Sequence, residues 1–94
     1  MLFMEFPDLQ VSTYDKIMDE LNASGALNNK GPLFHTCGTN PNGGLSIFDI
    51  WDSEESFNKF GETLMPLFKK YKVNMPKQRF VPLHNMVSNL VQHA

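Results

Sequence analysis

Cysteine is almost absent from this sequence, since Cys37 is the single one among 94 residues. One thiol cannot form a disulfide within the chain, which fits a reducing compartment. No apolar run approaches the roughly 18 residues of a membrane-spanning helix. The N-terminal MLFMEFPDLQ lacks a basic segment and is interrupted by Pro7, so it does not resemble a signal peptide. We therefore expect a cytoplasmic protein with no membrane partner.

Positive charge is also scarce. Lys and Arg number 8 against 10 Asp and Glu, which gives a formal net charge of −2. No cluster of Lys and Arg is interleaved with aromatic residues, as a nucleic-acid-binding groove requires. The one local run, Lys69, Lys70 and Lys72, is typical of a solvated helix end. We expect no nucleic-acid partner.

Motifs for metal, nucleotide and hydrolytic chemistry are missing as well. No spacing of His, Cys and carboxylate residues resembles a metal site. The NPNGG stretch is typical of a turn and not of a phosphate-binding loop. No Ser-His-Asp set or pair of catalytic carboxylates can be assembled. We therefore expect neither a metal nor a bound cofactor, and the sequence identifies no catalytic residue.

The hydrophobic pattern predicts six elements in the order β-α-β-β-α-β. A two-residue period or a short apolar run indicates strands over residues 2–6, 33–39, 45–51 and 78–87, and residues 28–32 read as a loop. A helix with Ser12 as its cap is expected to end at Gly25. A second helix, capped by Asp52 or Ser53, is expected to kink or restart near Pro66.

This element order is typical of an α+β, ferredoxin-like βαββαβ fold. It predicts a four-stranded antiparallel sheet in spatial order 4-1-3-2 with both helices on one face. Residues 1–94 fit a single domain with a tail from about residue 88. The third strand is apolar on both faces, so the uncovered sheet face would expose a large apolar patch. We therefore expect a homodimer through the open sheet face.

Three segments resemble the dimeric α/β-barrel superfamily, in particular the small proteins related to antibiotic biosynthesis monooxygenases. They are GPLFH at 31–35, DIWDSEESFNKF at 49–60 and VPLHN at 81–85. The resemblance implies a dimer whose two sheets face each other as a barrel, with a cavity between sheet and helices in each subunit. Some members oxidise aromatic polyketides or quinols with dioxygen and no added cofactor, and others cleave haem. Trp51 stands at a position that lines the cavity in those enzymes.

Candidate site residues gather near the predicted cavity. Trp51 lies at a strand-to-helix corner, where its ring either packs the helix onto the sheet or forms a pocket wall. Imidazoles within apolar strands need hydrogen-bond partners, so the strand histidines are either structural or functional. Asp49 alternates onto the face of Trp51. The pocket candidates are Trp51, His35, His84, Asp49, Asn85, Phe57, Phe60 and Tyr71.

Two functions remain open from these residues. The first is a dimeric protein that binds a small apolar or aromatic ligand between sheet and helices. The alternative is a cofactor-independent monooxygenase that acts on an aromatic or quinol-type substrate, as the resemblance implies. Polar groups that converge beside Trp51 would favour chemistry, and an entirely apolar lining would favour binding alone. Whether the protein is an enzyme stays open at this point.

Overall fold

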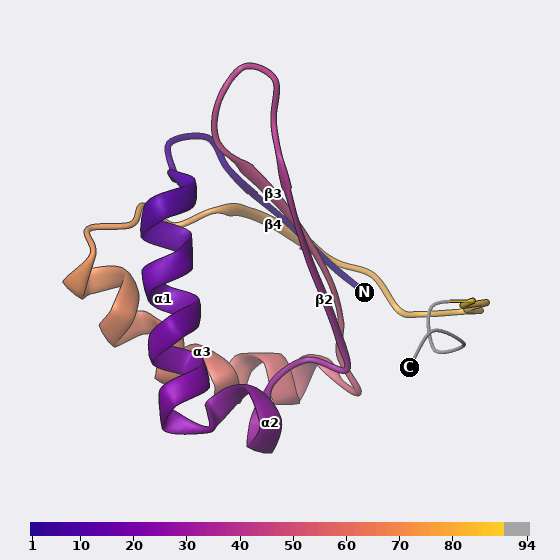
Figure 1. Cartoon of the computed structure of the whole chain (residues 1–94). Helices are drawn as coiled ribbons and strands as arrows, with labels where there is room; N and C mark the ends of the chain where they lie inside the picture. Colours follow the sequence, from indigo (N-terminus) through magenta and orange to yellow (C-terminus); the bar gives the residue numbers. More distant parts are fainter. Residues whose placement is uncertain (90–94) are drawn as a thin grey trace.

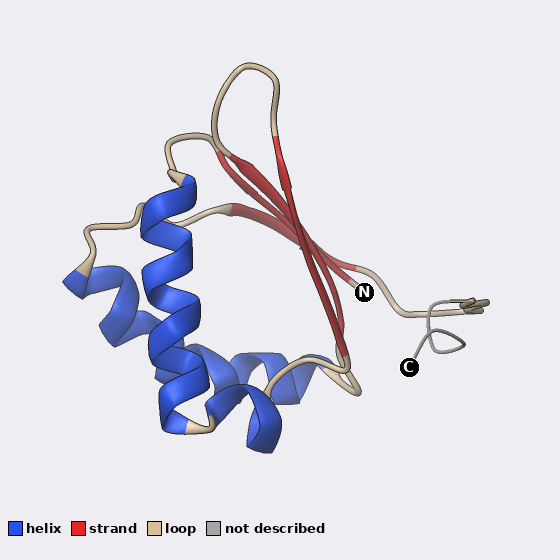
Figure 2. Ribbon diagram, viewed as in Figure 1, coloured by secondary structure: helices blue, strands red, loops and turns tan. Residues whose placement is uncertain are grey.

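Three helices cover one face of a four-stranded antiparallel sheet (Figures 1 and 2). The structure is a computed structural model and describes residues 1–89. Its elements, in chain order, are β1 (Leu2–Phe6), α1 (Val11–Ser24), α2 (Ala26–Lys30), β2 (Phe34–Thr39), β3 (Leu45–Ile50), α3 (Glu54–Lys70) and β4 (Lys77–Phe80). The predicted α+β class is confirmed. Within residues 1–89, no helix combines the length and the apolar character needed to cross a membrane.

The sheet has β3 and β1 at its centre. Its order is β2-β3-β1-β4, and every neighbouring pair is antiparallel. The same sheet read from the β4 edge runs 4-1-3-2. Successive side chains of a strand point to opposite faces. We call the helix-covered face the inner face and the other the outer face.

The inner face forms the core together with the helices. Alternate residues of β1 and β3 point inward, and the apolar sides of α1 and α3 pack against them. Burying this apolar surface is the main favourable term in folding. The buried core residues are Leu2, Met4, Phe6, Leu9, Ile17, Leu21, Ala26, Leu45, Ile47, Trp51 and Phe60.

The ends of α1 agree in part with the prediction. The backbone N–H of Gly25 bonds the carbonyls of Leu21 and Asn22, and Gly25 has φ +77°, which confirms the expected left-handed cap. The prediction of Ser12 as the N-terminal cap is wrong. The helix already begins at Val11 after an extended Gln10 that makes no side-chain cap. Ser12 therefore lies inside the first turn.

The long helix α3 begins as predicted and is not interrupted at Pro66. Ser53 Oγ accepts a hydrogen bond from the N–H of Ser56 at 3.0 Å, which confirms Ser53 as the cap. Of the expected kink or new helix near Pro66, the new helix does not form, because α3 runs unbroken to Lys70. Pro66 has no N–H to donate to the carbonyl of Glu62, four positions earlier. Both residues are exposed, so water can satisfy that carbonyl.

Two further boundaries differ from the prediction. Residues 26–30 form the short helix α2, directly after Gly25 turns the chain, where part of a loop was expected. The last strand ends at Phe80 instead of Val87. Met1 and Val81 still exchange backbone hydrogen bonds. Pairing goes no further because Pro82 has no N–H to donate. Residues 81–89 leave the sheet away from the helices (Figure 1). Residues 90–94 of the expected tail lie outside the described part.

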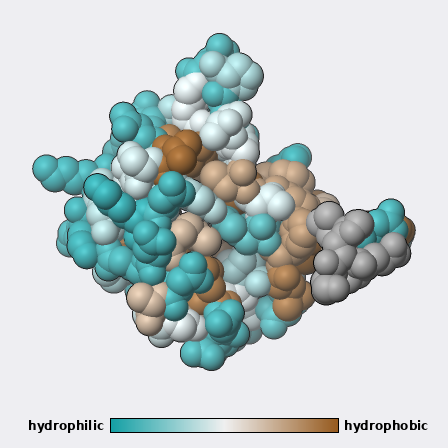
Figure 3. Space-filling view, viewed as in Figure 1, coloured by the Kyte–Doolittle hydropathy of each residue, from teal (hydrophilic) through white to brown (hydrophobic). Residues whose placement is uncertain are grey.

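The outer face carries a row of aromatic side chains. The Phe48 ring lies 5.2 Å from Phe3 and 6.4 Å from Phe34, centroid to centroid, and all three are partly exposed. The guanidinium of Arg79 stands 5.1 Å above the Phe3 ring, a cation–π geometry. Figure 3 shows apolar surface, in tan and brown, on the sheet side of the molecule, while the helix side is mostly teal.

Candidate functional site

A small cavity lies between the inner face of the sheet and the three helices. Its volume is about 60 Å³. Aliphatic and aromatic side chains from both layers make up most of its wall, and of the described residues no Lys or Arg takes part. The inner cavity is lined by Met4, Phe6, Leu9, Tyr14, Ile17, Met18, Leu21, Leu27, Pro32, His35, Ile47, Asp49, Trp51, Phe57, Phe60, Leu64 and Phe68.

Aromatic rings form one side of the inner cavity. Trp51 follows β3 directly, at the corner where the chain turns into α3, and its ring lies 5.6 Å from Phe57 and 5.3 Å from Phe60. The Trp51 side chain therefore both packs α3 onto the sheet and lines the cavity. Its indole N–H is buried and has no hydrogen-bond partner within residues 1–89. Buried donors of this kind are rare because each one loses its bond to water.

Polar side chains from three elements form a hydrogen-bonded chain on another side of the inner cavity. The register of β2 and β3 sets His35 directly opposite Asp49, and His35 Nδ1 lies 2.6 Å from Asp49 Oδ1. His35 Nε2 lies 2.5 Å from the hydroxyl of Tyr14 on α1. Only 3% of Asp49 is exposed. We call Asp49, His35 and Tyr14 the polar relay.

The protons in the polar relay follow from the hydrogen-bonding capacity of each group. The Asp49 carboxylate can only accept, so the proton on a neutral His35 ring belongs on Nδ1. His35 Nε2 is then an acceptor, and the Tyr14 hydroxyl donates to it. Burial raises the pKa of Tyr14, with Cys37 and Asp49 adding to the effect. Tyr14 therefore stays protonated at neutral pH.

Cys37 lies beside the polar relay on the same face of β2 as His35. Burial raises the pKa of its thiol, and a hydrogen bond with Tyr14 acts in the opposite direction. Because the burial effect is the larger, the thiol stays protonated at neutral pH, and a protonated thiol is a weak nucleophile. Within residues 1–89, no group of three or more His, Cys, Asp or Glu side chains could hold a metal ion.

The structure brings five of the eight sequence-predicted candidates to the inner cavity: Trp51, His35, Asp49, Phe57 and Phe60. The placement of His84 on a strand was wrong, because β4 ends at Phe80. His84 and Asn85 lie exposed on the segment of residues 81–89.

Tyr71 also lies outside the inner cavity, at the end of α3. Its hydroxyl donates to Glu20 Oε2 on α1, and Lys70 Nζ binds the same oxygen at 2.8 Å. The hydrogen bond from Lys70 has the largest effect on Glu20 and lowers its pKa, and the bond from Tyr71 lowers it further. The bond to Glu20 in turn raises the pKa of Tyr71. This cluster joins α1 to α3 and does not reach the polar relay.

Tyr14 is the site residue that the sequence did not reveal. The helical period places it on the inner stripe of α1 with Ile17 and Leu21, where an aromatic residue reads as core. A phenol hydroxyl on such a stripe needs a hydrogen-bond partner when it is buried. That requirement could have marked Tyr14 as a candidate. Its partner His35 on β2 could not be predicted, because that contact depends on how α1 lies across the sheet.

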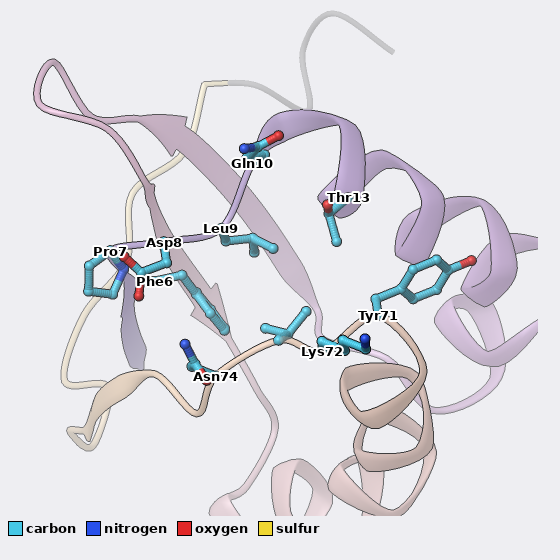
Figure 4. Close-up of a pocket in the computed structure, with 10 residues that line it drawn as sticks. Phe6, Pro7, Asp8, Leu9, Gln10, Thr13, Tyr71, Lys72 and Asn74 are labelled. Carbon is cyan, nitrogen blue, oxygen red and sulfur yellow. The ribbon is translucent and has the colours of Figure 1, made fainter.

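A second hollow lies beside the start of α1, shares Phe6 and Leu9 with the inner cavity and is larger, at about 300 Å³. Figure 4 shows Gln10 and Thr13 on one side of it and Tyr71 and Lys72 on the other. It is lined by Phe6, Pro7, Asp8, Leu9, Gln10, Thr13, Tyr71, Lys72, Val73 and Asn74. No hydrogen bond between side chains of these lining residues organises it within the described chain, in contrast to the polar relay. The inner cavity is therefore the candidate site.

Comparisons with protein-family models, with curated proteins and with solved structures found no significant match. The geometry of the site therefore carries the functional argument.

Removing either partner of the buried pair in the polar relay should have unequal effects on stability. His35→Leu leaves the Asp49 carboxylate buried without its partner, and we expect a loss of about 3–5 kcal/mol in the free energy of unfolding. Asp49→Leu leaves only a neutral imidazole N–H, and we expect a loss of about 1–3 kcal/mol. Urea unfolding at pH 7 measures both. The double variant should be more stable than His35→Leu alone, and equal losses in the two single variants would contradict this account.

Proposed function

We propose that this protein binds a small apolar or aromatic molecule in the inner cavity, with the ligand's polar end at Tyr14. The observation that carries the proposal is the almost entirely apolar surface of the inner cavity, with the polar relay in one part of its wall. Ligand sites commonly combine an apolar lining with a few polar groups that fix orientation. The aromatic wall at Trp51 provides a flat surface for a ring.

The size of the inner cavity restricts how a ligand enters. A dry cavity of about 150 Å³ admits benzene, whereas the inner cavity measures about 60 Å³. A ring must therefore displace side chains at the wall. Met18 on α1 and Leu27 on α2 line the cavity and are partly exposed, and the unbranched side chain of Met18 adopts several rotamers. Movement of these two side chains would open the cavity toward solvent.

Cofactor-independent oxygenation is the second candidate function. Tyr14, His35 and Asp49 belong to the wall of the cavity that Trp51 also lines, although nearly all of the surface that faces the cavity is apolar. The similarity of the Trp51 region to antibiotic biosynthesis monooxygenases supports the same activity. In this candidate, dioxygen is the oxidant, and an electron-rich aromatic or quinol substrate is the reductant. The polar relay would position that substrate.

A homodimer through the outer face is part of the proposal. Phe3, Phe34 and Phe48 leave a partly exposed aromatic row there. The segment of residues 81–89, which leaves the sheet on the side away from the helices (Figure 1), contains the exposed apolar residues Leu83 and Met86. A second copy that packs against this face would remove both from water. The single free Cys37 thiol supports a cytoplasmic location.

Enlarging the inner cavity should strengthen the binding of aromatic ligands. Trp51 is the only tryptophan, so its fluorescence reports occupancy of the cavity directly. We expect phenol to quench it saturably, and Met18→Ala to bind phenol roughly fivefold to tenfold more tightly because less wall must move. Met65→Ala, on the exposed side of α3, is the control and should leave affinity unchanged. The proposal would be contradicted if neither the natural sequence nor Met18→Ala showed quenching.

Dioxygen uptake tests the second candidate. An oxygen electrode, with a panel of quinols and the metal-free protein, should record consumption above the buffer blank. His35→Gln should reduce that rate by about tenfold or more, as loss of a positioned acid–base group does. Uptake that equals the blank for every quinol would leave ligand binding as the function.

A charge on the outer face should prevent dimerisation. Phe48→Glu places a carboxylate in the aromatic row, and burying it would cost several kcal/mol, so the dimer should weaken by at least about a hundredfold. Sedimentation velocity at micromolar concentration should show a dimer for the natural sequence and a monomer for the variant. Lys59→Glu, on exposed α3 surface, is the control. A natural chain that sediments as a monomer would refute the dimer.

A further inference from the structure

We propose that the second hollow, beside the start of α1, binds a small zwitterion, namely an α-amino acid with an apolar side chain. The volume of this hollow, about 300 Å³, lies at the lower end of the range for small-molecule sites. The site is separate from the inner cavity and does not depend on the function proposed above. Two opposite charges and an apolar floor carry the proposal.

Two charged side chains of opposite sign line the second hollow. Asp8 lies just after β1 and Lys72 just after α3, and Figure 4 shows them on opposite sides of the hollow. Neither takes part in an ion pair within residues 1–89. A ligand with a single charge would be attracted by one of these groups and repelled by the other. A zwitterion can place its ammonium at Asp8 and its carboxylate at Lys72, so its charges complement both.

The floor of the second hollow is apolar. Phe6 and Leu9 are only 3% and 8% exposed, and Val73 packs against the same core. An aliphatic side chain on the ligand would cover this floor and remove its own surface from water. Gln10 and Asn74 stand at the rim, where their amide groups can both donate and accept hydrogen bonds. The lining therefore matches an amino acid that has an apolar side chain.

Lys72 occupies a backbone conformation that usually selects glycine. Its φ is +57°, and within residues 1–89 it is the one residue other than glycine with a positive φ. The N–H of Lys72 donates to the carbonyl of Lys69, and the N–H of Val73 donates to that of Phe68, which together form a Schellman cap. Glycine would avoid the steric cost of this conformation. A lysine here is unfavourable for the fold, but it supplies the ammonium that a carboxylate needs.

Both walls of the second hollow are held in place by hydrogen bonds. The turn that carries Asp8 is closed by a bond from the N–H of Leu9 to the carbonyl of Phe6, at 3.4 Å. On the other wall, the Tyr71 hydroxyl donates to Glu20 and joins the end of α3 to α1. A site whose walls are already ordered loses less conformational entropy when a ligand binds.

Isothermal titration calorimetry with L-leucine at neutral pH tests the site, and two analogues each remove one charge. N-Acetyl-L-leucine keeps the carboxylate, and L-leucinamide keeps the ammonium. We expect leucine to bind saturably and each analogue to bind at least about fivefold more weakly, as loss of a partly exposed charge contact predicts. Amide ¹H–¹⁵N signals of residues 8–10 and 72–74 should shift with leucine, while Trp51 fluorescence should not change.

Two variants match the two analogues. Asp8→Asn should weaken leucine binding about fivefold without weakening that of N-acetyl-leucine, which has no ammonium to lose. Lys72→Gly should weaken leucine binding by a similar factor without weakening that of leucinamide. It should also raise the melting temperature by a few degrees, because glycine relieves the left-handed backbone. Weaker binding by a more stable chain cannot result from unfolding.

Asp19→Asn, on exposed α1 surface outside the second hollow, is the control and should bind leucine as the natural sequence does. An analogue that binds the natural sequence as tightly as leucine would overturn the zwitterion. Absence of saturable leucine binding at millimolar concentration would overturn the site itself. Both results leave the function of the inner cavity standing, because quenching of Trp51 by phenol measures that site separately. The three ligands with the natural sequence decide even if a variant fails to fold.

Discussion

The buried carboxylate of Asp49 is the constraint on which the rest of this structure depends. Asp49 lies on a central strand with 3% of its surface exposed, and a charge removed from water needs a partner. The β2–β3 register supplies His35 as that partner, and the second nitrogen of His35 holds Tyr14 of α1. One carboxylate thus sets how β3, β2 and α1 lie together, and it gives the inner cavity its polar side.

The apolar remainder of the cavity follows from the corner between β3 and α3. Trp51 directly follows the strand and packs against Phe57 and Phe60 of the helix. These rings hold α3 on the sheet, while α1 is held by the core and by the polar relay. Departures from an apolar core of this kind commonly mark functional sites.

Local signals made much of the fold predictable. The two-residue period of β3, the cap at Ser53 and the left-handed Gly25 each depend on neighbours in sequence. The face shared by Asp49 and Trp51 followed from the same alternation. Contacts between elements that are distant in the sequence could not be predicted from it. Tyr14 joins the site only through the position of α1 over β2, and His84 was misplaced because β4 ends when its partner strand does.

The central claim is that His35 carries its proton on Nδ1 and accepts from Tyr14 through Nε2. Long-range ¹H–¹⁵N correlation spectra of the histidine side chains at neutral pH read the tautomer directly, and the His35→Gln variant assigns the signals. The account predicts one histidine fixed as the Nδ1–H tautomer, with its Nε2 signal shifted in Tyr14→Phe. A His35 that populates mainly the Nε2–H tautomer, or that does not respond to Tyr14→Phe, would contradict it.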